Sequence, residues 1–391
     1  LFFLLCVACG NAAGEARLKL GIERLPEYRE VFAGKRVGLI TNQTGIDAEG
    51  TPSAVLLSRA AQLTVLFSPE HGIQGNEREG ASIGHSTDPR TGLPVYSLYG
   101  NTKRPTPEML KDIDVLCFDI QDVGARFYTY ISTMAYSMEE CARHKKRFVV
   151  FDRPNPIGGS VEGNMLELEY RSFTGYFPIV QRHGMTVGEL ALLFNTEYGI
   201  CCDLTVIPME GWNRTAYFDE LPLIWVPPSP NIPSAQTALV YAGVCLFEGT
   251  NLSVGRGTAM PFQYLGAPYI DAYRLAEQLN RLDLDGVRFL PAFFTPTLSL
   301  YAGKLCGVQI AVTDRRTFAP VKTAIAMFYE LKHQYPNEFT INNAGKKYCG
   351  LHLLTGCTQL TDSSQTAQDY FTRIEKESAQ FSNIRKKYLL Y

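Results

Sequence analysis

The 391-residue sequence lacks the short motifs that identify several large enzyme classes. No G-x-G-x-x-G segment opens its first predicted helix and no G-x-x-x-x-G-K-[ST] loop occurs, which excludes the usual dinucleotide and nucleotide-phosphate sites. It has no H-E-x-x-H pair and only six histidines, which argues against a zinc site. The G-x-S-x-G turn of a serine nucleophile is absent too. Carboxylates are therefore the expected catalytic groups, and neither a cofactor nor a metal is expected.

Charge is also scarce, with 19% charged residues, a formal net charge of −2 and no basic block. Electrostatic binding of nucleic acid needs clustered Lys and Arg on one face, so no nucleic acid partner is expected. No apolar run approaches the ~20 residues that cross a bilayer as a helix. The 46% apolar content is typical of a folded protein. Because single hydrophobic cores stop growing at about 250–300 residues, we expect two packed domains.

Residues 1–17 read as a signal-peptide remnant and linker, because an apolar run ends in small residues at Gly10. Val7-Ala8-Cys9 resembles the end of a bacterial lipobox, which would place a lipid on Cys9. Cys6 stands where that motif usually has Leu, so the sequence leaves the lipid open. We expect an exported protein, periplasmic or lipid-anchored in the cell envelope, with membrane contact only through Cys9.

The eight cysteines after Cys9 form no C-x-x-C pair and have no zinc-ligand spacing with histidine. Several lie inside apolar runs, as Cys117 does. We expect buried free thiols that pack as small apolar side chains. Whether Cys349 and Cys357 form a disulfide is left open by the sequence.

Short apolar runs alternate with helical patterns over the first half of the chain. Continuous apolar runs of this length are typical of strands buried on both faces of a parallel sheet. Thr51 and Thr106 are candidate helix N-caps, and Thr186 with Glu189 forms a capping box. The alternation predicts an α/β fold with a Rossmann-like, doubly wound, mostly parallel sheet. The expected strands are 36–41, 63–68, 114–119, 147–152 and 204–209, and the expected helices are 52–60, 107–111, 132–144 and 187–198.

The proline-dense segment 225–234 marks a domain boundary, because proline is excluded from helix interiors and central strands. We expect a Rossmann-like catalytic domain over 18–225 and a smaller α+β auxiliary domain over 226–391. The pattern in the second domain predicts a Gly-rich loop at 249–258, strands near 286–294 and 307–313, helices at 272–281, 321–334 and 365–376, and a helical tail over 381–391.

Polar side chains follow four successive predicted strands. Ligands of open α/β sheets bind outside the carboxyl ends of the strands, so this row predicts a binding cleft at one edge of the sheet. One polar strand end is ordinary turn chemistry, whereas four together are harder to explain that way. The row comprises Asn42, then Glu70 and His71, then Asp119, Gln121, Asp122 and Arg126, and finally Asp152 and Asn155.

Glu70 is the strongest single candidate for a catalyst. It directly follows a predicted buried strand, between Pro69 and His71-Gly72. Proline fixes one side of this turn, and glycine lets the backbone approach a ligand closely. A carboxyl group at the mouth of an apolar sheet is placed to serve as a general acid. The alternative is a glutamate that only caps the next segment. The competing carboxylates are Asp119, Asp122 and Asp152.

Two of these carboxylates have an arginine close by in the sequence. This suggests ion pairs that stabilise loops and have no catalytic role. We expect Asp122 to pair with Arg126, and Asp152 to pair with Arg153. Such pairs are more often structural than catalytic, which favours Glu70 over its competitors.

The Gly-rich loop 249–258 contains Arg256 and follows Glu248. It is either a simple turn or a backbone nest that holds an anion together with one arginine. Glu248 precedes the loop and could face the first domain across a cleft. The sequence alone does not choose between these interpretations.

At these residues the sequence resembles a known family, the exo-β-N-acetylmuramidases of the NamZ type, which are peptidoglycan hydrolases of glycoside hydrolase family 171. Several of the matching motifs are long and unusual, and the match runs from about residue 21 to at least residue 314. The matching segments are 36–45, 67–75, 96–100, 118–130, 152–156, 182–186, 227–231 and 248–258.

The resemblance implies an active site in the cleft between a Rossmann-like domain and an auxiliary domain. It implies the release of N-acetylmuramic acid (MurNAc) from non-reducing ends of peptide-free peptidoglycan fragments such as MurNAc-GlcNAc. Glu70 matches the catalytic glutamate of the Pro-Glu-His-Gly motif. Glycoside hydrolysis usually needs a second carboxylate, or a 2-acetamido group of the substrate in its place. The second group could be Glu248, Asp119 or Asp122.

The lactyl carboxylate of muramic acid needs a cationic partner, for which Arg126 and Arg256 are the candidates. Tyr128 and Tyr130 could stack on the sugar or belong to the core. The complete set of predicted substrate-binding residues is Asn42, His71, Gln121, Arg126, Tyr128, Asp152, Asn155, His183, Asn231, Asn251 and Arg256.

Two other classes of function stay open at this stage. One is a non-catalytic carbohydrate-binding envelope protein that uses the same cleft. The other is a nucleotide- or phosphate-binding enzyme, which ranks last because its phosphate motif is missing. The expected partners are peptidoglycan-derived saccharides.

Overall fold

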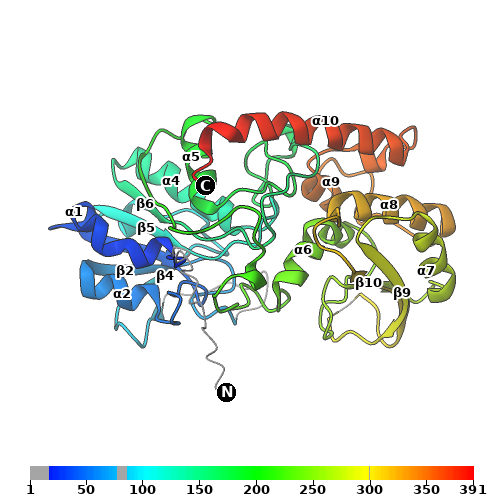
Figure 1. The fold of residues 1–391 in the computed structure, drawn as a ribbon, viewed down its shortest axis with the longest axis horizontal. Coiled ribbons are helices and arrows are strands. Elements are labelled where there is room, and N and C mark those ends of the chain that lie inside the picture. The colour runs from blue at the N-terminus through cyan, green and yellow to red at the C-terminus, as the bar shows by residue number, and fades with distance from the viewer. Residues whose placement is uncertain (1–16, 77–85, 299) are drawn as a thin grey trace, which may run out of the picture.

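A computed structural model describes residues 17–76, 86–298 and 300–391 (Figure 1). The predicted lipid site at Cys9 lies outside these residues. Within them, seven strands form one sheet in the order β3-β4-β2-β1-β5-β6-β7, and every neighbouring pair is parallel except β3–β4. The predicted α/β fold with a mostly parallel sheet is confirmed. The strands are β1 (Arg36–Thr41), β2 (Gln62–Ser68), β3 (Ser86–Thr87), β4 (Pro94–Ser97), β5 (Val115–Asp119), β6 (Arg147–Phe151) and β7 (Asp203–Ile207).

The strand order reverses between β1 and β5. The chain proceeds from β1 to β2 and β4 on one side, and from β5 to β6 and β7 on the other. Thr41 at the end of β1 lies opposite Asp119 at the end of β5, so the two strands finish at the same level. Such a reversal opens a crevice at the carboxyl edge of a sheet. The predicted row of polar strand ends therefore lies along one edge.

Helices cover both faces of this sheet (Figure 1). Val37 and Leu39 of β1 pack with Leu57 of α2 (Ser53–Ala60), whereas Ile40 belongs to the core formed with α4 (Tyr130–Arg143) and α5 (Val187–Thr196). Successive strand residues point to opposite faces, so one apolar run serves both cores. The other helical segments before β7 are η1 (Gly21–Tyr28), α1 (Arg29–Phe32), α3 (Pro107–Leu110) and η2 (Leu168–Tyr170).

Two of the three predicted helix caps are confirmed. The Glu189 N–H donates to Thr186 Oγ1 at 3.3 Å, and the Thr186 N–H donates to Glu189 Oε2 at 3.0 Å, so the capping box of α5 is complete. Thr106 accepts the Met109 N–H and caps α3. Thr51 is not a cap: Pro52 occupies that position without a side-chain bond. The Thr51 N–H instead donates to Asp47 Oδ1 at 2.6 Å, because Asp47 closes the preceding turn.

A second, smaller unit contains a three-stranded antiparallel sheet in the order β8-β10-β9. Helix α7 packs on β9 and β10, and α6 packs on α8. The sequence did not predict β8, β4 or α6. The strands are four residues long, and α6 is apolar nearly all round and so shows no amphipathic stripe. The elements are η3 (Phe218–Glu220), α6 (Ala235–Val244), η4 (Cys245–Gly249), β8 (Tyr264–Ala267), α7 (Ala272–Arg281), β9 (Val287–Phe294), β10 (Leu305–Val312), α8 (Pro320–Gln334), α9 (Gly350–Thr355), η5 (Gln359–Thr361), α10 (Ala367–Arg385) and η6 (Lys386–Tyr388).

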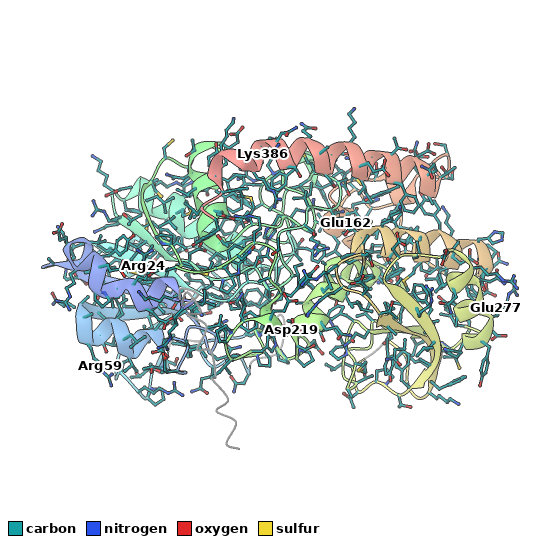
Figure 2. All side chains as sticks on the ribbon, viewed as in Figure 1. Arg24, Arg59, Glu162, Asp219, Glu277 and Lys386 are labelled. Atoms are coloured by element: carbon teal, nitrogen blue, oxygen red, sulfur yellow. The ribbon has the colours of Figure 1, made fainter. Side chains whose placement is uncertain are left out.

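The last helix returns from the second unit to the first. Helix α10 runs along the top of the molecule and ends beside α5 (Figure 1). The Arg385 guanidinium donates to the carbonyl oxygens of Gly184 and Gly159 at 2.6 and 2.9 Å. Elsewhere between the units, Glu162 accepts the backbone N–H of Lys322 in the first turn of α8 at 2.7 Å (Figure 2). Residues 226–391 are thus not a separate appendage.

The cysteines that the structure describes are all free. Cys349 and Cys357 are both buried and are not joined, so the disulfide that the sequence left open is not formed. Burial raises the pKa values of the Cys117 and Cys141 thiols well above the usual value for cysteine. Both thiols therefore stay protonated. The expectation of buried free thiols is confirmed for six of the eight described cysteines and is wrong for Cys201, which is exposed, while Cys306 is partly buried.

Asp152, at the end of β6, is fully buried and holds the C-terminal residue. Asp152 Oδ2 accepts the hydroxyls of Thr186 and Tyr391, both at 2.7 Å, and Oδ1 accepts the Gly188 N–H at 2.7 Å. Burial raises the pKa of this carboxyl group to about 7. The predicted side-chain ion pair between Asp152 and Arg153 is wrong, since Asp152 accepts only the backbone N–H of Arg153.

This raised pKa predicts a pH-dependent stability. Between the unfolded pKa near 3.8 and the folded pKa of about 7, the folded protein binds a proton that the unfolded chain has released. The free energy of unfolding should therefore fall as pH rises through this window, by up to about 1.4 kcal/mol per pH unit from this group. Urea denaturation at pH 5, 6 and 7 measures the slope. An Asp152→Asn variant should have a flatter slope, and parallel slopes for the two proteins would contradict the assignment.

Candidate active site

A pocket of about 420 Å³ lies between the two units at the carboxyl edge of the large sheet. The loop after β2 contributes Glu70 and His71, and the segment leading into α4 contributes 127–130. The second unit and its approach contribute the other wall. Within the part of the chain that the structure describes, Glu70 is the only carboxylate in this lining. The second wall comprises Ser229, Ile232, Tyr241, Arg256 and Phe262.

Glu70 is held at the pocket by an unusual turn and one hydrogen bond. His71 and Gly72 follow it with φ of 71° and 77°, so two successive residues adopt the left-handed conformation. That conformation suits Gly72 and is uncommon for His71. The Thr129 hydroxyl donates to Glu70 Oε2 at 2.7 Å. The half-buried carboxyl group is therefore fixed in direction, with Oε1 left for a ligand.

Tyrosines and phenylalanines form the rest of the pocket. Tyr128 lies edge-to-face against Tyr130 and Tyr241, with ring centroids 4.9 and 5.7 Å apart, and Tyr241 meets Phe262 at 4.8 Å. Burial raises the pKa of the Tyr128, Tyr130 and Tyr241 hydroxyls, so all three stay neutral at physiological pH. An apolar wall with phenolic hydroxyls suits a sugar ring.

Arg256 brings positive charge to the pocket wall from the second unit. Its Nε donates to Glu248 Oε1, and its guanidinium lies 5.0 Å from the Phe262 ring centroid. Glu248 also lies near Cys245, whose thiol donates to it at 3.5 Å. Glu248 is thus placed behind Arg256, where it orients the guanidinium. It does not line the pocket.

Asp119, a predicted catalytic candidate, is locked in the interior. Both of its oxygens accept from Arg153, with Nη2–Oδ2 at 2.9 Å, and Ser53 donates to Oδ2 as well. The Asp119 side chain is 0% exposed and that of Arg153 is 4% exposed. A carboxylate that is enclosed and neutralised in this way cannot contact a substrate. The prediction of Asp119 as a catalytic group is therefore not supported by its position.

Asp122 is buried but only half satisfied. Its Oδ2 accepts the Gly124 N–H at 2.7 Å and lies 3.7 Å from His183 Nε2. Asp122 Oδ1 and His183 Nε2 have no hydrogen-bond partner within the described chain. His183 Nδ1 accepts the Met185 N–H, so a neutral ring carries its proton on Nε2. Buried polar atoms without partners are rare and mark places where a ligand or water belongs.

The predicted ion pair between Asp122 and Arg126 is wrong. Arg126 is 1% exposed and donates to four carbonyl oxygens, two in the first unit and two at the end of α9, at 2.7–2.9 Å. Burial lowers the pKa of this guanidinium to about 10. Arg126 therefore joins the two units and is not placed to bind a lactyl carboxylate.

The remaining predicted binding residues mostly support the loops behind the pocket. Asn42 donates to the Tyr130 hydroxyl at 3.0 Å and so orients a pocket residue. Gln121 donates to the Asp122 and Pro154 carbonyls, and Asn155 donates to the Met185 carbonyl. Asn251 donates to the Glu338 carbonyl, away from the pocket lining. Asn231 lies half-buried between Ser229 and Ile232, which line the pocket.

Some pocket residues were not predicted as site residues. Thr129 stood inside the motif 118–130, where its position beside Tyr128 and Tyr130 was the available signal. Tyr241 and Phe262 lie in apolar segments that look like core, and only the packing of the second unit places them at a cleft. Ser229 lies in the matching segment 227–231, in which only Asn231 was predicted to bind substrate.

The described residues contain no group of three or more His, Cys, Asp or Glu side chains arranged to hold a metal ion. None of the helices among those residues has the length and apolar composition needed to cross a membrane. The pocket lining itself carries Arg256 on one wall and Glu70 on the other.

A carboxyl group held at a tyrosine-rich pocket between two units is typical of a carbohydrate-active enzyme. Two family models together cover nearly the whole described chain. The exo-β-N-acetylmuramidase NamZ N-terminal model matches residues 37–236, and the C-terminal model matches 239–391. The chain belongs to the NamZ family of exo-β-N-acetylmuramidases and is a glycosidase, as its motifs indicated.

Relatives of known sequence and structure agree with this. The peptidoglycan β-N-acetylmuramidase NamZ of Bacillus subtilis (strain 168) is 47% identical over 388 residues, which cover 97% of this chain and 93% of that protein. A crystal structure of a DUF1343 family protein from Bacteroides fragilis matches with a TM-score of 0.89 and 39% identity, covering 97% of this chain and 100% of that one. A second protein of that family from the same organism matches with a TM-score of 0.72 and 30% identity, covering 96% and 99%.

Proposed function

We propose that this chain releases MurNAc from the non-reducing ends of peptidoglycan fragments such as MurNAc-GlcNAc, with Glu70 as the general acid. The observation that carries this is the position of Glu70, the pocket's carboxylate, fixed by Thr129 against the tyrosine wall. Glu70 would donate its proton to the glycosidic oxygen as the bond to the leaving sugar breaks. The tyrosine hydroxyls and ring faces would hold the muramic acid ring.

For the second catalytic group we propose Asp122, with His183 as its positioning partner. Asp122 also lies outside the pocket lining, but one of its oxygens has no partner in the described chain, whereas Asp119 is neutralised by Arg153 and Glu248 lies behind Arg256. The 2-acetamido group of the substrate is the alternative nucleophile. These two mechanisms differ in what Asp122 must do, because a substrate-assisted reaction needs the carboxylate only to orient the amide.

Release of MurNAc from MurNAc-GlcNAc, followed by NMR of the fresh product, tests the activity and reads the anomer formed. We expect free MurNAc and GlcNAc in equal amounts from the wild-type protein. Binding of the disaccharide without turnover would instead identify a carbohydrate-binding protein. An Asp122→Asn variant should lose turnover by at least tenfold with its folding unchanged, and full activity in this variant would exclude Asp122.

Arg256 is proposed to pair with the lactyl carboxylate of muramic acid. Charge-assisted hydrogen bonds contribute about 1.5–3 kcal/mol, which corresponds to roughly 10–100-fold in binding. An Arg256→Met variant should therefore lose kcat/KM on a chromogenic N-acetylmuramide by that factor, and lose less on the N-acetylglucosaminide, which lacks the lactyl group. Because this change also unpairs Glu248, the Arg256→Met, Glu248→Gln double variant is the matched control. An equal loss on both substrates would contradict the role.

We also propose export of the protein to the cell envelope, with Cys9 as a lipid attachment site. The support is the sequence of residues 1–10 and a substrate that is cell-wall material. Cell fractionation of the wild-type protein and a Cys9→Ala variant tests this. Recovery of both proteins in the same soluble fraction would exclude the lipid.

A further inference from the structure

A second and larger hollow lies on the other side of the Glu70 loop. It has a volume of about 1320 Å³, compared with about 420 Å³ for the pocket. It is formed by the ends of β1 and β2, the start of α2, the segment before β4 and the start of the proline-dense segment. We call it the outer groove, and its lining includes Asn42, Gln43, Gln74, Arg90, Ile224 and Val226.

The outer groove and the pocket share two segments and are connected by one hydrogen bond. In the loop after β2, Glu70 lines the pocket and Gln74 lines the groove. In the proline-dense segment, Ser229 lines the pocket and Val226 lines the groove. Asn42 lines the groove and donates to the hydroxyl of Tyr130, a pocket residue. The two hollows are therefore neighbours, with the catalytic loop between them.

The Gln43 side chain lines the outer groove and bonds to the proline-dense segment, which borders both hollows. Its Nε2 donates to the Pro227 carbonyl at 2.8 Å and to the Pro228 carbonyl at 3.3 Å. The amide lies directly on Gly75, where an added Cβ would come within 2.1 Å of it. Gly75 also has φ of 69°, so both space and backbone require glycine there. Gln43 Oε1 is buried and accepts no hydrogen bond within the described chain.

The chemistry of the groove suits an amino-sugar chain that carries carboxylates. Gln74 brings an exposed amide group, and Ile224 and Val226 bring apolar surface, whereas the amides of Asn42 and Gln43 are held by hydrogen bonds within the protein. Arg90 is exposed and has no ion-pair partner among the residues that the structure describes. Sugar hydroxyls and N-acetyl groups match the Gln74 amide and the apolar surface, and a lactyl carboxylate matches the arginine.

We propose that the outer groove binds the leaving-group side of the glycan: the GlcNAc released by cleavage and the sugars that follow it. This rests on the proposed function. A hydrolase that removes a terminal sugar needs a small pocket for that sugar and an open site for the rest of the chain, with the acid between the two. The pocket, the Glu70 loop and the groove have this order. The next muramic acid along the chain presents its carboxylate to Arg90.

The test compares two substrates that differ only on the leaving-group side. One is MurNAc-GlcNAc, and the other is a chromogenic N-acetylmuramide, whose small phenol does not fill the groove. An Ile224→Trp variant narrows the groove at a side chain that is 55% exposed, so the fold tolerates it. The ratio of kcat/KM for the disaccharide to that for the chromogenic substrate should fall about tenfold. A Leu168→Trp variant, 63% exposed and outside both hollows, is the control and should keep the wild-type ratio.

The role of Arg90 is tested with a longer fragment. An Arg90→Gln variant should lose kcat/KM about tenfold on MurNAc-GlcNAc-MurNAc-GlcNAc relative to MurNAc-GlcNAc. An unchanged substrate ratio in both Ile224→Trp and Arg90→Gln overturns the groove assignment while leaving the proposed function intact. Absence of MurNAc release by the wild-type protein from every substrate overturns the proposed function, and the groove assignment with it.

Discussion

An E70Q enzyme should fold normally and hydrolyse MurNAc-GlcNAc about 10²–10⁴-fold more slowly than the wild type, the range that a general acid contributes. Glutamine has the shape of glutamate and can still accept the Thr129 hydroxyl, so the loop keeps its geometry. It has no acidic proton for the leaving oxygen. Steady-state kinetics on the disaccharide measure the loss, and circular dichroism checks the fold.

The choice of leaving group separates an acid from other roles of Glu70. An acidic phenol is a leaving group that departs without protonation. The fall in turnover rate caused by E70Q should therefore be at least tenfold smaller on a substrate with such a leaving group. An equal loss on both substrates would indicate a nucleophile or base at position 70. A Thr129→Val variant is the matched control for the hydrogen bond, and its loss should be smaller than that of E70Q. Wild-type turnover in E70Q would remove Glu70 from the mechanism.

Asp119→Ala should destabilise the protein by about 3–5 kcal/mol, because it leaves the Arg153 charge buried without a partner. Urea denaturation measures the free energy of unfolding. An Asp119→Leu, Arg153→Met double variant removes both charges and should recover much of the loss, because buried ion pairs are often replaced by apolar side chains at little cost. The double variant should also retain turnover. An inactive but stable double variant would return Asp119 to the catalytic candidates.

Local sequence patterns were sufficient to predict five of the seven strands of the large sheet; β3 and β4 are too short to show a pattern. Runs such as 36–41 are buried on both faces, and such strands depend on continuous apolar character rather than on distant partners. The Thr186–Glu189 box was readable because both partners lie within one helical turn. Thr51 failed as a cap because α2 begins at Ser53, which places Pro52 at the N-cap position.

The identity of charge partners was not readable from the sequence. Closeness in sequence suggested the pairs Asp152–Arg153 and Asp122–Arg126. Arg153 instead pairs with Asp119 on the neighbouring strand, and Arg126 bonds to carbonyl oxygens more than two hundred residues away. Neighbours in an extended segment point to opposite sides, so proximity in sequence is a poor guide to pairing. Pairing across the strands depends on register, which only the folded sheet fixes.

The sequence predicted the part of the candidate site that lies in the first unit, but most of the part in the second unit was missed. Glu70 and Tyr128 lie in the first unit, beside strand ends whose position follows from the sheet order. Tyr241 and Phe262 come from the second unit, and their apolar neighbours made them look like core residues. Their place at the pocket depends on how the two units dock, which no local pattern encodes.

The return of α10 gives the molecule two covalent crossings between its units instead of one. The chain leaves the first unit through 225–234, and Arg385 and Tyr391 fasten its return on the sheet. Two units joined by a single segment can rotate about it. Two joining segments, the second held by hydrogen bonds, restrict that rotation. The walls of the Glu70 pocket should therefore keep their spacing in the absence of sugar. For the same reason, we expect the two units to unfold on heating in one step rather than in succession.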